Sequence, residues 1–179
     1  GVSAIEVERR GQAAFVLSDR GTGHRFTIER TEQGGRINDL TFVKLPLTDR
    51  DTEGLATSDQ AIFISYEDPA NISTVDGQIL PSPREFNALP VNGALEALAV
   101  TADGTILTIP ENPPKRTGTF PIYRYKNGVW DVAAYLPRTG GFQPTGADVG
   151  PEGRLYVLER AFSPLGFRTR IRRITLDTP

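Results

Sequence analysis

The feature that most constrains the fold is a short pattern that occurs four times along the chain. Each copy has an apolar strand, a turn, a second apolar strand and then an acid, as in LEALAVTADGTILTIPENP from Leu95. Repeats of about 40–50 residues, built from short strands and tight turns, are typical of β-propeller blades. The sequence therefore predicts an all-β propeller. The acids that close the four copies are Asp19, Glu67, Glu111 and Glu159.

Each copy is expected to form one blade of four antiparallel strands. The first copy supplies four apolar or alternating runs, and no segment of the chain shows the sustained 3.6-residue apolar period of a helix. The last copy lacks an outer strand, so we expect a propeller that is incomplete or not closed within this chain. The expected blades span residues 1–46, 51–90, 94–137 and 144–179.

Composition excludes several kinds of chemistry. The 179 residues contain no Cys and a single His, so thiol catalysis is excluded and a Ser–His–Asp triad would depend on His24. His24 lies in the Gly-rich stretch RGTGHR, which we interpret as a solvated loop. A net charge of −2 disfavours nucleic-acid binding, and no apolar run is long enough to span a membrane. G-x-S-x-G and phosphate-loop motifs are also absent, which leaves carboxylates as the candidate chemistry.

Glu53 and Glu96 begin the first strand of two consecutive copies. The innermost strand of a propeller blade lines the channel, so the two acids should lie at the same height on neighbouring blades. Like charges so placed repel unless a cation lies between them or one is protonated. Ca²⁺ prefers several oxygen ligands, so both acids are candidate metal ligands and catalytic residues, with Asp51 assisting Glu53. The alternative is structural, with each acid accepting hydrogen bonds from the next blade.

The acids that close the second strands should lie at the same rim, because a hairpin reverses direction. Two of them are followed by arginine, and guanidinium groups bind phosphate and carboxylate through two hydrogen bonds. Ion pairing and turn capping are the structural alternative. The run TRIRRITL at 169–176 is expected to form a strand whose arginines face solvent or, alternatively, bind phosphate. The candidate substrate-binding residues are Asp19, Arg20, Glu67, Glu111, Glu159 and Arg160.

Four stretches of the chain resemble one bacterial family, known as "esterase-like activity of phytase" or phytase-like. They are LSDRG at 17–21, DTEGLA at 51–56, NGALEALAV at 92–100 and LYVLERAFSPLGFRTRIRRITL at 155–176. The resemblance implies a propeller, export to the periplasm or medium, and hydrolysis of phosphate or carboxylic esters. Relatives generally continue beyond the last stretch. They also carry an acid where this chain has Thr145-Gly146, whereas here the acid of the fourth copy is Asp148.

The sequence therefore favours a phytase-like or esterase-like hydrolase of a small ester or phosphoester, with a divalent cation at the propeller mouth. One alternative is a propeller without enzymatic activity that binds a ligand or a protein, since one fold hosts both classes. A weaker alternative is a metal-dependent sugar-lactone hydrolase, which also places acids where inner strands begin. Substrate, metal identity and oligomeric state stay open.

Overall fold

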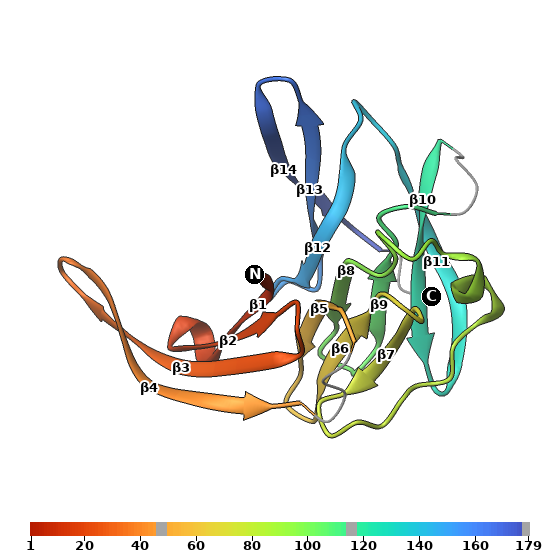
Figure 1. Cartoon of the computed structure of the whole chain (residues 1–179). Coiled ribbons are helices and arrows are strands. Elements are labelled where there is room, and N and C mark those ends of the chain that lie inside the picture. Colours follow the sequence, from red (N-terminus) through yellow and green to blue (C-terminus); the bar gives the residue numbers. More distant parts are fainter. Residues whose placement is uncertain (46–49, 114–117, 177–179) are drawn as a thin grey trace.

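The chain folds into four antiparallel sheets, one for each sequence repeat (Figure 1), which we call blades 1 to 4. The computed structural model describes residues 1–45, 50–113 and 118–176. Blades 1 and 3 have the expected four strands in sequential order. Their strands are β1 (Val2–Glu8), β2 (Ala13–Ser18), β3 (Thr22–Thr31) and β4 (Gly34–Lys44), then β8 (Ala97–Val100), β9 (Ile106–Ile109), β10 (Thr119–Lys126) and β11 (Val129–Pro137).

Blades 2 and 4 have three strands each within the described residues. The short fourth strand expected near Ile79 is a single bridge to Ser73. Across the described residues, helical structure is limited to two 3₁₀ segments, η1 (Arg9–Gly11) and η2 (Arg84–Ala88). No helix in this part of the chain has the length and hydropathy that a membrane crossing requires. The strands are β5 (Thr52–Thr57), β6 (Ile62–Tyr66) and β7 (Asn71–Thr74) in blade 2, and β12 (Gln143–Val149), β13 (Leu155–Ser163) and β14 (Gly166–Ile174) in blade 4.

The first strands of the blades lie side by side around a common centre. Strand β1 contacts β5, β5 contacts β8, and β8 contacts β12. The blades fan outward from these strands, with blade 1 on the left of the view and blade 4 at the top (Figure 1). This arrangement is that of a β-propeller, as the repeats predict.

Apolar side chains fill the space between consecutive blades. Phe15 of blade 1 packs with Leu55 and Ile64 of blade 2, and equivalent clusters join blade 2 to blade 3 and blade 3 to blade 4. Trp130 packs against the cluster between blades 2 and 3. Gly54 allows the inner strands to approach closely, because a Cβ there would lie 2.8 Å from the Cβ of Leu98.

The prediction that His24 lies in a loop is wrong. His24 is part of β3, and its half-buried ring packs edge-on against Phe42, 5.6 Å between centroids. The strand begins earlier than expected because Ser18 and Thr22 close the preceding turn through a 2.7 Å hydrogen bond between their hydroxyls, while Gly21 adopts φ 66°.

Candidate functional site

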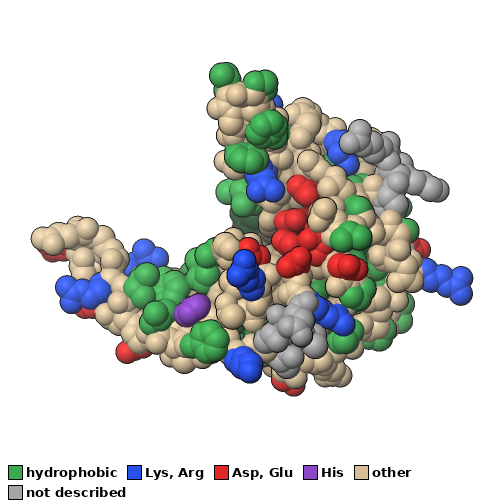
Figure 2. All heavy atoms as spheres, viewed as in Figure 1, with side chains coloured by type: hydrophobic (Ala, Val, Ile, Leu, Met, Phe, Trp, Pro, Cys, Tyr) green, Lys and Arg blue, Asp and Glu red, His purple; other side chains and the backbone are tan. Residues whose placement is uncertain are grey.

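Three glutamates from two neighbouring blades converge where the inner strands begin. A carboxylate oxygen of each of Glu53, Glu67 and Glu96 lies within 4.8 Å of the others, and all three side chains are half-buried. We call this group the carboxylate cluster. Figure 2 shows Asp and Glu side chains gathered at the centre of this face, between the blades. The sequence-based expectation that strand starts and strand ends share one rim holds for these residues.

The hairpin of blade 2 positions two members of the cluster. Thr52 pairs with Tyr66, so Glu53 and Glu67, the next residues, lie at the same end of the hairpin. The Glu67 N–H donates to the carbonyl oxygen of Asp51 at 3.1 Å. The Thr52 hydroxyl donates to the Ser18 carbonyl oxygen at 2.5 Å, which fixes this end of the hairpin to blade 1.

A buried hydroxyl connects this hairpin to the segment that carries the third glutamate. Ser65 Oγ accepts a 2.8 Å hydrogen bond from the Gly54 N–H and donates a 2.6 Å hydrogen bond to the Leu95 carbonyl oxygen. Gly54 follows Glu53, and Leu95 precedes Glu96. The separation of these two glutamates is therefore set by backbone groups that meet at one buried oxygen.

The segment between blades 2 and 3 orients Glu67. The Gly93 N–H donates to Glu67 Oε1, and Gly93 has φ 82°, which favours glycine. A Cβ on Gly93 would lie 2.6 Å from Glu111 Oε2, so the position also has no room for a side chain. The sequence offers only an Asn-Gly pair here, which does not by itself indicate a contribution to the site.

Burial and mutual repulsion raise the pKa values of Glu53 and Glu96, two members of the cluster. Desolvation, followed by repulsion from Glu96 and Glu67, raises the pKa of Glu53 to about 8. Desolvation, followed by repulsion from Glu111 and Glu67, raises the pKa of Glu96 to about 7. The fold thus holds acids together against their own repulsion, which protonation or a bound cation relieves.

Arg160 and Glu111 border the cluster. Arg160 Nη2 lies 3.9 Å from Glu111 Oε1, and the guanidinium also stands 5.3 Å from the ring centroid of Phe167. Desolvation raises the pKa of Glu111, while Arg160 opposes the rise. The positive charge of Arg160 also opposes the rise in the pKa of Glu96, so Arg160 acts on the cluster itself.

Several predicted site residues lie outside the cluster. Asp19 is half-buried at the end of β2, and one of its carboxylate oxygens lies 2.6 Å from the backbone nitrogen of Gly1. Arg20 is exposed on the turn after β2. Asp51 is exposed just before β5 and acts on Glu53 through its charge. Asp148 pairs with Tyr156 farther along blade 4, and its charge acts on Glu6.

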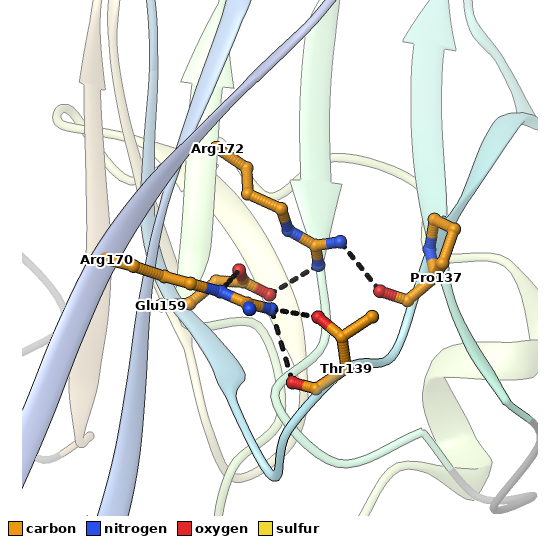
Figure 3. Close-up of polar contacts among 5 residues, drawn as sticks. All are labelled: Pro137, Thr139, Glu159, Arg170 and Arg172. Atoms are coloured by element: carbon orange, nitrogen blue, oxygen red, sulfur yellow. Dashed lines mark hydrogen bonds and ion pairs between the residues drawn. The ribbon is translucent and has the colours of Figure 1, made fainter.

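Glu159 lies in a separate ion-pair group within blade 4 (Figure 3). Its side chain is fully buried, with Oε2 2.7 Å from Arg170 Nε and Oε1 2.5 Å from Arg172 Nη2. Arg172 Nη1 also donates to the Pro137 carbonyl oxygen at 2.7 Å, and Arg170 Nη2 to the Thr139 hydroxyl at 2.5 Å. These contacts attach blade 4 to the link from blade 3. The prediction that the β14 arginines face solvent is therefore wrong for Arg170 and Arg172.

The sequence reasoning also missed Glu6. This side chain is buried on β1, between the exposed Ile5 and Val7. Desolvation, then repulsion from Asp148 and Glu8, raises the pKa of Glu6 to about 8. Its alternation with apolar neighbours was the available signal, because the acid faces the opposite side of the strand from them.

A cavity of about 460 Å³ extends between the inner strands from the cluster, with Glu53 and Glu96 in its wall. The donor set of the cluster consists of carboxylate oxygens, which suit hard divalent cations such as Ca²⁺, Mg²⁺ or Mn²⁺. The hydrogen bond from the Gly93 N–H to Glu67 Oε1 orients this carboxylate. The residues therefore fit a cation of this class.

Comparison with solved structures finds propeller-like neighbours with little sequence likeness. The crystal structure of Citrobacter koseri AztD is 12% identical, with a TM-score of 0.42, and the match covers 92% of this chain and 60% of that chain. A glucose dehydrogenase is 12% identical, with a TM-score of 0.48, and coverage of 99% and 82%. YCF48 bound to D1 peptide is also 12% identical, with a TM-score of 0.35, and coverage of 96% and 68%. At this level of similarity, these structures carry no argument about activity.

No curated protein matches the chain. A family model, in contrast, matches the entire sequence. The phytase-like model, described as "esterase-like activity of phytase", matches residues 1–179. That match agrees with the four sequence stretches noted above and with the propeller that the structure shows. The chain therefore belongs to the phytase-like family.

Proposed function

We propose that this protein hydrolyses a phosphate or carboxylic ester with the help of a divalent cation, Ca²⁺ being the first candidate, held by Glu53, Glu67 and Glu96. The observation that carries the proposal is the convergence of three half-buried carboxylates within 4.8 Å. Without a cation, this arrangement raises the pKa of Glu53 to about 8, so the fold opposes ionisation of its own cluster. Membership of the phytase-like family supports a hydrolase, and a periplasmic or secreted location belongs to the same proposal.

The three glutamates fill only part of a coordination sphere. Ca²⁺ takes about six to eight oxygen ligands, so a bound Ca²⁺ would need further oxygens, from water or from the substrate. A cation bound there polarises the ester oxygen and lowers the pKa of a nearby water. Glu67 is the best-fixed ligand, because the Gly93 N–H orients its carboxylate.

The groups that border the cluster supply the remaining roles. Glu111 accepts a proton from the attacking water; it is half-buried, with a raised pKa, next to the cluster. The water oxygen adds to the acyl carbon or phosphorus, the bond to the ester oxygen breaks, and the leaving alcohol takes up the proton. Arg160, with an exposed guanidinium that reaches Glu111, stabilises the negative charge that develops on the substrate. Arg20, at the rim of blade 1, is a further candidate for this task.

Cation binding and turnover test the proposal separately. The protein is stripped with EDTA, and Ca²⁺, Mg²⁺ and Mn²⁺ are titrated by calorimetry. Hydrolysis of 4-nitrophenyl phosphate and 4-nitrophenyl acetate is then followed with each cation. Glu67→Gln is expected to weaken cation binding at least tenfold and to reduce turnover in parallel. The matched control is Glu32→Gln, because Glu32 is an exposed glutamate on the turn between β3 and β4. The absence of turnover with every cation would refute the hydrolase.

Two alternatives concern the same site. The cavity beside the cluster supports a propeller that binds a small ligand without chemistry, and cation binding without turnover would favour it. A sugar lactone is a cyclic ester, so the same carboxylates could serve a lactone hydrolase. Adding a lactone to the substrate set distinguishes this case.

A further inference from the structure

The cavity beside the carboxylate cluster has a composition that indicates what kind of ester it accepts. Its volume of about 460 Å³ lies within the range of small-molecule sites. Glu53 and Glu96 line it, while Glu67 does not. A substrate that places its reacting carbon at the cluster would therefore extend one of its groups into this space (Figure 2).

Most of the cavity wall is aliphatic. Leu158 and Ile171 are paired across β13 and β14, and they remain 42% and 67% exposed. Such side chains gain free energy when a ligand covers them, because apolar surface leaves water. The aliphatic lining comprises Val2, Ala4, Ile5, Leu55, Leu98, Ala147, Leu158 and Ile171.

The charges in the cavity disfavour an anionic group. Among the described residues that line it, the charged ones are Glu53, Glu96 and Asp148, and none is Lys or Arg. Arg160 pairs with Glu111 at the border of the cluster and does not line the cavity. With the cation held by Glu53 and Glu96, Asp148 is the acid of the wall left uncompensated, and a phosphate in this space would face it without a guanidinium or ammonium partner, which is unfavourable in a partly desolvated site.

We propose, on the basis of the hydrolase function above, that the substrate is a neutral carboxylic ester whose acyl chain occupies this cavity. The ester carbonyl then lies at the carboxylate cluster, and the alcohol portion faces the mouth near Arg160. Water adds to the acyl carbon, the bond from that carbon to the ester oxygen breaks, and the alcohol leaves with a proton taken from the water. The products are one carboxylic acid and one alcohol.

Acyl-chain length is the direct test. Cation-loaded protein is assayed with 4-nitrophenyl acetate, butyrate and hexanoate, with 4-nitrophenyl phosphate, and with butyrylcholine. Each added methylene should raise kcat/KM about three- to fourfold if it is buried in the cavity. Ile171→Ser, which replaces an aliphatic residue of the cavity wall, should flatten this dependence. Leu165→Ser is the matched control, because Leu165 is a fully exposed aliphatic residue of blade 4 outside the cavity.

The outcomes separate this inference from the hydrolase itself. Faster cleavage of the phosphate, a flat chain-length profile, or preference for butyrylcholine over 4-nitrophenyl butyrate overturns the acyl-chain inference and leaves a hydrolase. If no substrate is cleaved, ligand binding still tests whether the cavity prefers an apolar neutral chain, by an NMR titration that compares octanamide with octyl phosphate. Saturable octanamide binding that Ile171→Ser weakens supports the apolar cavity, and its absence overturns it.

Discussion

Replacing Glu159 by Gln should destabilise the fold strongly. The Glu159 side chain is fully buried, and each carboxylate oxygen contacts one arginine, at 2.7 Å for Arg170 and 2.5 Å for Arg172. Glutamine occupies nearly the same volume, so Glu159→Gln removes the negative charge without leaving a large cavity. The two guanidinium groups would then remain next to each other without a counter-ion.

The structure bounds the size of this effect. Removing one partner of a buried ion pair typically costs about 3–5 kcal/mol, because the other charge is left uncompensated. The arginine side chains keep 30% and 22% exposure, so water reaches them in part. The lower end, about 3 kcal/mol, is therefore expected. With a urea m-value of about 2 kcal/mol/M, the unfolding midpoint should fall by about 1.5 M.

Equilibrium unfolding in urea measures this change. Trp130 is the only tryptophan of the chain and packs 5.1 Å from Phe86, so its fluorescence reports on the fold, with far-UV circular dichroism as a second probe. Glu32→Gln, which removes an exposed carboxylate from the turn between β3 and β4, should leave the midpoint unchanged. A midpoint shift below about 0.5 M for Glu159→Gln would contradict the reasoning. An unchanged midpoint together with a large loss of ester hydrolysis would restore Glu159 as a substrate-binding residue.

Two further predictions concern Glu6 and the glycine beside the cluster. Burial raises the pKa of Glu6 to about 8 from 4.5, so the native protein binds more protons than the unfolded chain between these values. Stability should therefore fall as pH rises from about 5 to 8, and urea titrations should show that Glu6→Gln gains stability relative to the wild type over that window. Gly93→Ala should lower the free energy of unfolding by about 1–2 kcal/mol, because Gly93 has φ 82° and a Cβ there would crowd Glu111. The same variant should lower the Ca²⁺ affinity, measured by calorimetry, at least tenfold. Gly104→Ala, at φ 83° with open space around the Cβ, should lose stability alone, and equal Ca²⁺ affinities in the two variants would contradict the assignment.

The repeat pattern predicted the architecture because a propeller is built from local hairpins. A continuous apolar run located strand β2 at Ala13–Ser18, and turn residues located the hairpin at 102–104. Glu53 and Glu96 could be grouped because equivalent positions of neighbouring blades face the same centre. Glu67 and Glu111 followed from the reversal of chain direction in a hairpin, and Glu67 joins the cluster while Glu111 borders it.

The position of Glu159 in the repeat could not predict that its side chain lies outside the carboxylate cluster, in an ion-pair group of its own. Glu159 occupies the same repeat position as Glu67, yet its direct neighbour across the sheet is Arg170, and Arg172 lies on the same face. A repeat predicts where a residue lies, but the cross-strand neighbour decides its charge environment. Fine positioning depended on single atoms, such as the Gly93 N–H and the Ser65 hydroxyl, for which the sequence gave no pattern.

The Ser65 hydroxyl has a mechanical consequence. Through it, the backbone beside Glu53 and the backbone beside Glu96 are joined, although the two glutamates belong to different blades. An ion drawn to both glutamates would thus act as a clamp between blades 2 and 3. By reciprocity, a change that destabilised the contact between blades 2 and 3 would lower the affinity for the ion, and loss of the ion would destabilise that contact.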